Sequence, residues 1–475
     1  MSSYKVTLIN PPYSEIYGPV VEAEGVSMPL GLLYIASYIR QFGVEVTVID
    51  GEAERLNSTS LRNRIKLSNP DLVGIFCTTP TLGVSLKVCD LVKEIDSDIP
   101  VVMGGPHPTV LPKEVLENKA VDFAIMAEGE HTFHELIMAL QKKGDFKKIL
   151  GLGYKAGEKL IVNPPRPLIE NLDELPYPAR DLVDRKNYFM AASRAFTLKL
   201  GKGYDDIITS RGCPYKCTYC GTQAIFGQRA RWRSVENVMG EIDEILQTSD
   251  SKILAFLDDT LTVNEERTIN LCDRIRERDP NIKFFCNSRV NVFTDEIAAA
   301  LKRAGCMLVG FGIESGNQQI LNNIKKGTTL QQAEKALAIA KKHGLNTLCA
   351  FMVGNPGENR KTAMDTIRFA LKLNPTFANF FITTPYPDTE LYDDAVKAGI
   401  LDRSDWSNFI AIPKGEPVVE LSDLSKKELV YFNRLAYKKF YLRPSYILKR
   451  AMGIRSLQEF KYAFKGLRTL IKLRQ

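Results

Sequence analysis

Short apolar strand patterns alternate with amphipathic helix patterns along most of this 475-residue chain. The first series of apolar runs comprises Lys5–Ile9, Val44–Asp50, Leu72–Cys77, Pro100–Met103 and Asp122–Met126, with helical patterns over 30–40, 83–96 and 131–143 between them. Several runs are apolar throughout, which favours a parallel sheet covered by helices on both faces. The alternation predicts an α/β fold that begins with a Rossmann-like domain over residues 1–145, with ligands at the carboxyl ends of its strands.

A second, longer series follows a connector. Residues 146–200 are rich in proline, include a hairpin pattern over 154–162, and are expected to be ordered because apolar residues recur among the prolines. Six strand patterns then alternate with helices across residues 201–400, at 206–210, 253–257, 283–287, 307–313, 347–353 and 378–383. Six units predict a partial (β/α)6 barrel rather than a closed eight-fold one. Residues 401–475 are expected to form a helical C-terminal region with a basic amphipathic tail.

The segments expected at the strand ends of the first domain are glycine, hydroxyl and proline loops. They are Thr78–Gly83, Gly104–Thr109 and Ala127–Glu130. Such loops let a large flat ligand approach the backbone, although ordinary strand-to-helix turns have the same composition. No Gly-x-Gly-x-x-Gly follows the first strand, so the sequence does not support an NAD site.

Cys213, Cys217 and Cys220 form a C-x3-C-x2-C motif directly after the first strand pattern of the second series. Three thiolates on one loop can hold three irons of a [4Fe–4S] cluster and leave the fourth iron open. The alternative is structural zinc, which normally takes four ligands in paired knuckles, and no second pair is present. The other six cysteines lie singly among apolar residues and are expected to be buried, inert thiols: Cys77, Cys89, Cys272, Cys286, Cys306 and Cys349.

With this motif, residues 1–400 resemble the radical S-adenosylmethionine (SAM) superfamily and, within it, the cobalamin-binding subgroup. The other segments that carry the resemblance follow the motif in the family's order: Tyr219, Phe256–Thr262, Asn287–Arg289, Gly310–Gly316 and Phe351–Glu358.

The resemblance implies that the three cysteines hold a [4Fe–4S] cluster whose open iron chelates SAM, and that reductive cleavage of SAM yields a 5′-deoxyadenosyl radical. It places Tyr219 against SAM, Glu314 at a ribose hydroxyl or the SAM amino group, and Arg289 at the SAM carboxylate. Asp258 and Asp259 contact SAM or substrate, unless their role is structural. The residues implied to bind SAM are Tyr219, Asp258, Arg289, Glu314, Ser315 and Gly354.

The resemblance also implies that the N-terminal domain binds cobalamin. The residues implied to contact it are Thr78, Thr79, Gly104, Gly105, His107, Glu128 and Gly129. The D-x-H-x-x-G motif, whose histidine ligates cobalt in other cobalamin proteins, is absent. We therefore expect no protein histidine on cobalt and place His107 beside the nucleotide tail, with cobalt ligation by His107 as the less favoured alternative.

The resemblance determines the cofactors more closely than it determines the reaction. The favoured function is methyl transfer through methylcobalamin to an unactivated carbon, with a second SAM remethylating the cobalt. The alternatives are radical cyclisation or another carbon-skeleton rearrangement, and a noncatalytic iron–sulfur or cobalamin sensor. The implied partners are an electron donor such as flavodoxin or ferredoxin and a small-molecule or lipid substrate; catalytic side chains are not identified.

The net charge of +7 is concentrated at one end. Lys438–Gln475 holds eleven Lys and Arg and one acid, a charge of +10, so the rest of the chain carries −3. A general nucleic-acid surface is therefore not expected. The chain lacks a signal-peptide pattern and a long apolar run, which predicts a cytoplasmic protein. Apolar residues recur at helical spacing in the tail, which predicts either a docked helix or contact with an anionic membrane surface: Leu457, Phe460, Phe464, Leu467 and Ile471.

Overall fold

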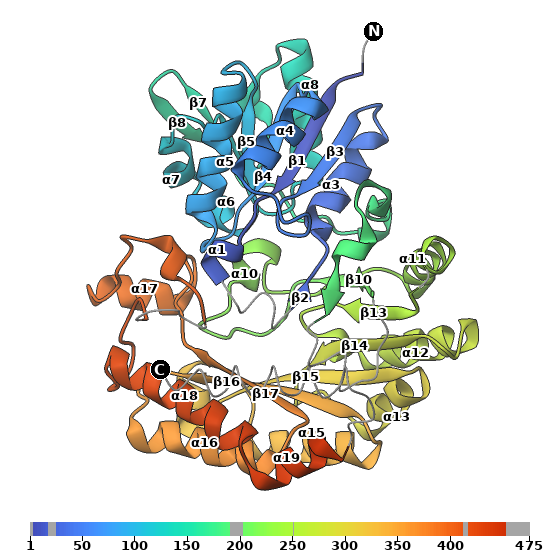
Figure 1. Cartoon of the computed structure of the whole chain (residues 1–475), viewed down its shortest axis with the longest axis vertical. Helices are drawn as coiled ribbons and strands as arrows, with labels where there is room; N and C mark the ends of the chain where they lie inside the picture. Colours follow the sequence, from blue (N-terminus) through green and yellow to red (C-terminus); the bar gives the residue numbers. More distant parts are fainter. Residues whose placement is uncertain (1–2, 18–24, 191–202, 250, 412–416, 453–475) are drawn as a thin grey trace.

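The computed structural model describes residues 3–17, 25–190, 203–249, 251–411 and 417–452. Two α/β units stack along the long axis of the molecule (Figure 1). The first unit, in blue and cyan, lies above the barrel unit, in yellow and orange. The predicted order of a Rossmann-like unit followed by a partial barrel is confirmed.

The first unit contains one seven-stranded sheet in the order β3-β1-β4-β5-β6-β7-β8. Its strands are β1 (Lys5–Asn10), β3 (Glu45–Asp50), β4 (Leu72–Phe76), β5 (Val101–Gly104), β6 (Phe123–Ile125), β7 (Leu152–Ala156) and β8 (Lys159–Val162). The first five in this order are parallel, and the chain reverses its direction of sheet growth between β1 and β4. Ligands of doubly wound folds bind at such a switch point. The predicted hairpin, β7–β8, pairs antiparallel with β6, so the sheet extends past residue 145.

Helices cover both faces of this sheet. They are α1 (Ser14–Tyr17), α3 (Leu30–Arg40), α4 (Ser58–Ser68), α5 (Leu82–Ile95), α6 (Pro106–Val110), α7 (Pro112–Glu117) and α8 (Glu130–Lys142). Apolar side chains of α3 and α8 pack on one face, and those of α4, α5 and α7 pack on the other. This two-sided burial explains why the strands are apolar throughout.

The barrel unit contains a six-stranded parallel sheet in the order β10-β13-β14-β15-β16-β17. The strands are β10 (Asp205–Ile207), β13 (Ile253–Phe256), β14 (Lys283–Ser288), β15 (Cys306–Glu314), β16 (Asn346–Val353) and β17 (Phe377–Ile382). The helices that follow them are α10 (Thr222–Phe226), α11 (Val235–Thr248), α12 (Glu265–Arg278), α13 (Asp295–Arg303), α14 (Gln318–Asn323), α15 (Leu330–Lys342), α16 (Arg360–Leu373) and α17 (Glu390–Lys397).

The first barrel strand is shorter than predicted. It ends at Ile207, and the next residues leave the sheet as β11 (Ser210–Arg211), which pairs antiparallel with β12 (Arg231–Trp232). A second small ladder joins β2 (Gly25–Val26) to β9 (Phe189–Met190). The early departure of the chain from β10 aims the cysteine loop at the mouth of the barrel rather than along the sheet.

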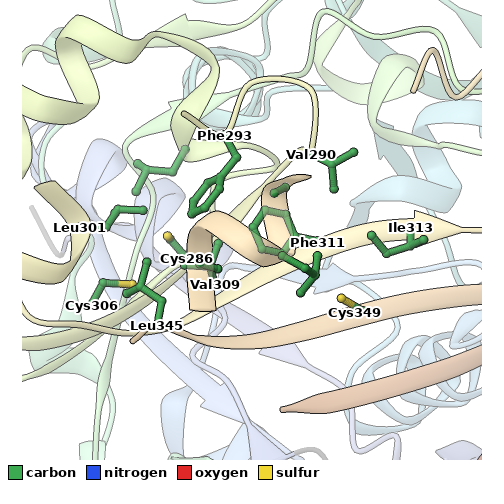
Figure 2. Packing of buried hydrophobic residues seen from close by; sticks show 14 of the residues in the cluster. Cys286, Val290, Phe293, Leu301, Cys306, Val309, Phe311, Ile313, Leu345 and Cys349 are labelled. Carbon is green, nitrogen blue, oxygen red and sulfur yellow. The ribbon is translucent and has the colours of Figure 1, made fainter. Parts of the chain in front are cut away.

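The six single cysteines are buried, as predicted. Cys286, Cys306 and Cys349 lie among aromatic and aliphatic side chains of the barrel core (Figure 2). Burial raises the pKa of Cys77 to about 12, and it also raises the pKa of Cys89, Cys272 and Cys349. A thiol in such surroundings is a poor metal ligand because the thiolate is disfavoured.

The C-terminal region continues as α18 (Lys426–Tyr441) and α19 (Pro444–Ala451). Helix α18 covers the edge strand β17: the Tyr437 hydroxyl accepts from Phe380 N at 3.2 Å, and Phe440 is fully buried in the barrel core. The first part of the predicted tail is therefore docked on the barrel. The apolar series from Leu457 to Ile471 lies outside the described residues. None of the described helices has the length and apolar character that a membrane crossing needs.

Candidate functional site

A mostly apolar cavity of about 350 Å³ lies between the carboxyl edge of the first sheet and the start of the barrel. The first unit contributes four of the predicted cobalamin residues, Gly104, Gly105, Glu128 and Gly129, to its lining. The barrel contributes Ile208, Ser210, Arg211, Ile225, Phe226, Leu257 and Asp259. One space is thus walled by both units.

Two glycines leave room in this cavity for a flat ligand to lie against the backbone. A Cβ atom added to Gly31 or to Gly104 would meet no protein atom within 4 Å, and both residues line the cavity. The backbone there is open to a ligand rather than packed against neighbouring side chains. The residues present therefore fit the corrin of cobalamin.

Thr78, Thr79 and His107 are not among the cavity-lining residues. The His107 ring is fully buried, its Nδ1 lies 3.3 Å from Thr79 Oγ1, and Trp406 packs against it edge to face. Burial lowers the pKa of His107 to about 4, so the ring is neutral. Contact of these three residues with cobalamin stays a prediction.

The side chain of Glu128 has a role that the sequence did not reveal. Its carboxylate accepts from Arg211 at 2.8 Å, from Arg231 at 2.8 Å and from the backbone N of Ile169 at 2.8 Å. Arg211 also bonds Glu130 at 2.6 Å. Burial acts to raise the pKa of Glu128, but the two guanidiniums hold it below its usual range. Glu128 therefore ties the first unit to the start of the cysteine loop, two residues before Cys213.

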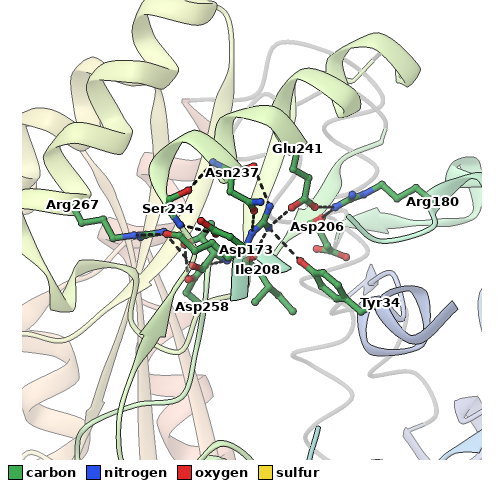
Figure 3. Close-up of polar contacts among 12 residues, drawn as sticks. Tyr34, Asp173, Arg180, Asp206, Ile208, Ser234, Asn237, Glu241, Asp258 and Arg267 are labelled. Carbon is green, nitrogen blue, oxygen red and sulfur yellow. Dashed lines mark hydrogen bonds and ion pairs between the residues drawn. The ribbon is translucent and has the colours of Figure 1, made fainter. Parts of the chain in front are cut away.

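A second buried network, beside this one, positions Tyr34 at the cavity wall (Figure 3). Arg233 bonds both Glu241 and, at 3.3 Å, the Tyr34 hydroxyl. Arg180 of the connector donates to Glu241 at 2.5 Å and to the carbonyl of Asp206 at 2.6 Å. The connector, α3 and the first barrel strands are thus held together by hydrogen-bonded charges, which are the form in which buried charges are tolerated.

The cysteine loop is shaped by its first residue and anchored in its middle. Gly212 has a φ of +88°, and a Cβ there would collide with the carbonyl oxygen of Arg229. Thr218 N donates to Ile324 O at 3.1 Å, and Thr218 O accepts from Leu391 N at 3.0 Å. Cys213 and Cys220 are half-buried, whereas Cys217 is buried.

The choice between a cluster and zinc rests on how each metal centre uses thiolates. A zinc ion would need its ligands about 2.0–2.3 Å from one point. A [4Fe–4S] cube presents separate irons to separate thiolates, so a loop carrying three spaced thiols fits the cluster better than zinc.

Near the predicted SAM site, Lys326 lies within hydrogen-bond distance of both Glu314 and Tyr219. Lys326 Nζ lies 2.8 Å from Glu314 Oε1 and 3.2 Å from the Tyr219 hydroxyl; Lys326 and Glu314 are buried and Tyr219 is partly buried. Burial and the Glu314 carboxylate raise the pKa of Tyr219 well above its usual value. Glu314 has a φ of +67°, which holds its side chain at the end of β15. Lys326 was missed because a single lysine in a loop has no distinguishing pattern.

The two acidic residues after β13, Asp258 and Asp259, have different surroundings. The Asp258 carboxylate accepts from Thr209 Oγ1 at 2.8 Å and from the Ser210 hydroxyl, so its oxygens are used within the protein. Asp259 lines the cavity and accepts from Thr222 Oγ1 at 3.2 Å. Burial raises the pKa of both carboxyls. Of the pair, Asp259 is placed to meet a ligand and Asp258 is placed to hold the cysteine loop.

Ser315 and Gly354 support turns at the ends of β15 and β16. Ser315 Oγ lies 3.2 Å from Thr366 Oγ1. Gly354 has a φ of +94°, and its N–H donates to Glu358 at 2.5 Å. Glu358 is fully buried, its other carboxyl oxygen has no hydrogen-bond partner among the described residues, and burial raises its pKa to about 7. Contact of Ser315 or Gly354 with SAM stays a prediction.

Comparison with known proteins agrees with this architecture. Residues 18–137 match the model of the B12 binding domain, and residues 207–370 match that of the radical SAM superfamily. A protein of Pyrococcus horikoshii named as an uncharacterized methyltransferase is 39% identical over 94% of this chain and 95% of its own length. The chain belongs to the cobalamin-binding radical SAM enzymes.

More distant relatives of this cobalamin-binding radical SAM enzyme differ in their named reactions. An anaerobic magnesium-protoporphyrin IX monomethyl ester cyclase of Rubrivivax gelatinosus is 26% identical over 93% of this chain and 78% of its own length. The structure of OxsB with aqua-cobalamin and SAM bound superposes with a TM-score of 0.76 at 19% identity, covering 98% of this chain and 71% of OxsB. The cofactors of this enzyme are cobalamin, SAM and a [4Fe–4S] cluster.

Proposed function

We propose that this enzyme transfers a methyl group from cobalamin to an unactivated carbon of a small-molecule or lipid substrate. The observation that carries the proposal is the shared cavity: Gly104 of the cobalamin unit and Asp259 of the barrel line the same space. A methyl carrier bound on one side and a radical source on the other can then act on one substrate placed between them. The relative with 39% identity, named as a methyltransferase, supports this reaction class.

When bound, the cluster and SAM supply a 5′-deoxyadenosyl radical for hydrogen abstraction, and methylcobalamin supplies the methyl group. Cys213, Cys217 and Cys220 hold the cluster, and Tyr219, Glu314 and Lys326 form the polar wall at the SAM side. Gly31 and Gly104 leave room for the corrin. Leu257 is 39% exposed and lines the cavity, so it offers an apolar surface that excludes water from a reactive substrate radical.

The test is anaerobic turnover of the reconstituted enzyme with SAM that carries a deuterated methyl group. Methyl transfer predicts a product that gains the deuterated methyl, formed together with 5′-deoxyadenosine and S-adenosylhomocysteine. Cyclisation, the reaction named for the 26% relative, predicts 5′-deoxyadenosine without S-adenosylhomocysteine. A chain that holds the cluster and SAM but forms no 5′-deoxyadenosine would support the sensor reading and overturn both reactions.

Two partners complete the proposal. A flavodoxin or ferredoxin supplies the electron that reduces the cluster. The basic C-terminal tail contacts an anionic membrane surface, because Ile447, Leu448 and Met452 of the last described segment are 45%, 61% and 71% exposed and the sequence from Lys438 to Gln475 is strongly basic. A membrane-partitioned substrate would then reach the cavity from the lipid surface.

A further inference from the structure

Arg289 lies beside the predicted cluster rather than in open space. Arg289 is 5% exposed, and its guanidinium stacks on the ring of Tyr215, which belongs to the cysteine loop, with the central carbon 3.6 Å from the ring centroid. Its Nη1 lies 3.6 Å from the Sγ of Cys217. The side chain therefore contacts the cysteine loop through both an aromatic face and a sulfur atom.

Two further contacts fix this orientation. Arg289 Nε donates to Asn291 Oδ1 at 3.2 Å, and Nη2 donates to the carbonyl oxygen of Lys326. Asn291 also donates to the Tyr215 hydroxyl at 3.3 Å. The guanidinium is thus locked before any ligand binds, with Nη1 aimed at the sulfur of Cys217.

What Arg289 lacks is a carboxylate. Within the part of the chain that the structure describes, no Asp or Glu oxygen lies within 4.0 Å of its guanidinium. Arg211, by contrast, faces Glu128 and Glu130. A buried cation requires a negative partner, and the sulfur of Cys217 becomes one when it ligates iron as a thiolate.

We propose that Arg289 is a positioning residue that tunes the cluster by donating a hydrogen bond from Nη1 to the Cys217 sulfur. This inference rests on the proposed ligation of the cluster by Cys213, Cys217 and Cys220. A positive donor at a ligand sulfur favours the reduced, more negative cluster, so it raises the reduction potential. Easier reduction of the cluster brings it within reach of a weak electron donor.

The role differs from the one that family resemblance implies, a salt bridge to the SAM carboxylate. Tuning through the sulfur acts on the cluster whether or not SAM is present. A salt bridge to SAM acts only when SAM is bound. The potential of the SAM-free cluster therefore separates the two roles.

The experiment compares wild type with Arg289→Gln and Arg289→Lys, each holding a reconstituted cluster without SAM. The reduced fraction is measured by electron paramagnetic resonance during an anaerobic redox titration. We expect the ratio of reduced to oxidised cluster at a fixed potential to fall at least tenfold in Arg289→Gln, a shift of about 59 mV to more negative potential. Arg289→Lys keeps the positive charge but loses the planar guanidinium with its fixed donors, so we expect its reduction potential to shift by less, in the same direction.

Arg267→Gln is the matched control. Arg267 is a half-buried guanidinium of the same barrel that donates to the backbone carbonyls of Thr209 and Arg233 and to no sulfur. Its removal should leave the potential unchanged. If Arg289→Gln does not fold, Asn291→Ala loosens the same guanidinium and should shift the potential in the same direction.

An unchanged SAM-free potential in the Arg289 variants, with weaker SAM binding, would overturn the proposal and assign Arg289 to the SAM carboxylate. A shift of equal size in Arg267→Gln would overturn it as well, because the effect would then be general to buried charge. If wild type itself assembles no cluster, the proposed ligation fails first. These results are distinguishable because iron and sulfide content are measured in every sample.

Discussion

The seam between the two units and the mouth of the barrel both bury guanidiniums, but they compensate the charge differently. At the seam, Arg211 and Arg231 converge on Glu128, and every one of these side chains is within hydrogen-bond distance of an opposite charge. At the mouth, Glu314 is paired with Lys326, but Arg289 has a sulfur in place of a carboxylate, and Glu358 keeps one carboxyl oxygen without a partner among the described residues.

The difference indicates which region depends on its cofactors. Removing one partner of a buried ion pair leaves an uncompensated charge and destabilises the fold, whereas a buried charge without a partner raises the free energy of the folded chain until a ligand compensates it. Substitutions at the seam should therefore change the free energy of unfolding. Substitutions at the mouth should change cofactor binding and the properties of the bound cofactor, such as its reduction potential.

The largest expected effect lies at the mouth. Replacing Cys213, Cys217 and Cys220 with alanine should abolish the cluster, because three irons lose their ligands. Iron and sulfide content after anaerobic reconstitution, with visible absorption, measures the loss. The secondary structure should persist, since Cys213 and Cys220 lie half-buried on a loop.

Buried cysteines provide the control for that experiment. Cys286→Ala and Cys349→Ala, replaced one at a time, remove thiols from the barrel core and should retain the full iron content. They should instead lower stability modestly through loss of packing. A cluster that survives in the triple variant, or disappears in either single variant, would show that the ligands are assigned wrongly.

The seam should respond in the opposite way. Arg211→Met leaves Glu128 and Glu130 without this partner, and breaking a buried pair costs about 3–5 kcal/mol. Chemical denaturation of the cofactor-free protein measures this cost. Arg62→Met removes an arginine that pairs with Glu94 at the surface and should cost no more than about 1 kcal/mol. Equal costs for the two variants would contradict the conclusion that the buried charges of the seam hold the fold together.

The two regions also differ in how much the sequence predicts. Apolar runs predicted both sheets because burial on two faces leaves little freedom in composition. The spacing of three cysteines predicts the cluster loop, and ligation by these thiols stays a prediction. The ion-pair partners of buried side chains could not be predicted from the sequence. Glu128 was expected to contact cobalamin, yet its carboxylate pairs with Arg211 and Arg231. These residues are up to 103 positions apart in sequence, so only the fold brings them together. Lys326 was missed because a single lysine in a loop has no distinguishing pattern.

A smaller effect is expected from pH at the mouth. Burial raises the pKa of Glu358 from its ordinary 4.5 to about 7. An acid whose pKa is higher in the folded than in the unfolded state lowers stability as pH rises between those two values. Over pH 5 to 8 the cofactor-free protein should lose about 2–3 kcal/mol through this group. Unfolding free energies measured across that range should decline less steeply in Glu358→Gln.

Glu334→Gln is the control for this titration because Glu334 pairs with Lys372 at the surface. Its stability should follow the wild-type decline with pH. If Glu358→Gln follows the same decline, the buried carboxyl contributes nothing in this range. The charge of Glu358 at the mouth would then be compensated as well as the charges of the seam are.

The smallest effect on the fold is expected at the C-terminus, where the same contrast recurs between two neighbouring helices. Helix α18 is bonded to the barrel: Asn433 and the hydroxyls of Tyr437 and Tyr441 bond the backbone of β17. Helix α19 exposes apolar side chains instead. A cut inside α18 would remove the buried Phe440 and unfold the edge of the barrel, so it cannot test a membrane role.

Truncation after Met452 tests that role, because it keeps α18 and α19 and removes six Lys and Arg with one Glu. Each basic residue near an anionic leaflet contributes about 1 kcal/mol, reduced by salt. Sedimentation with vesicles that contain anionic lipid should therefore show salt-sensitive binding by the full chain and much weaker binding by the truncated one. Thermal unfolding and cluster content should be unchanged, since the body of the enzyme is intact. Equal binding by both chains would assign the contact to the docked helices, and no binding by either would leave the tail without a membrane role.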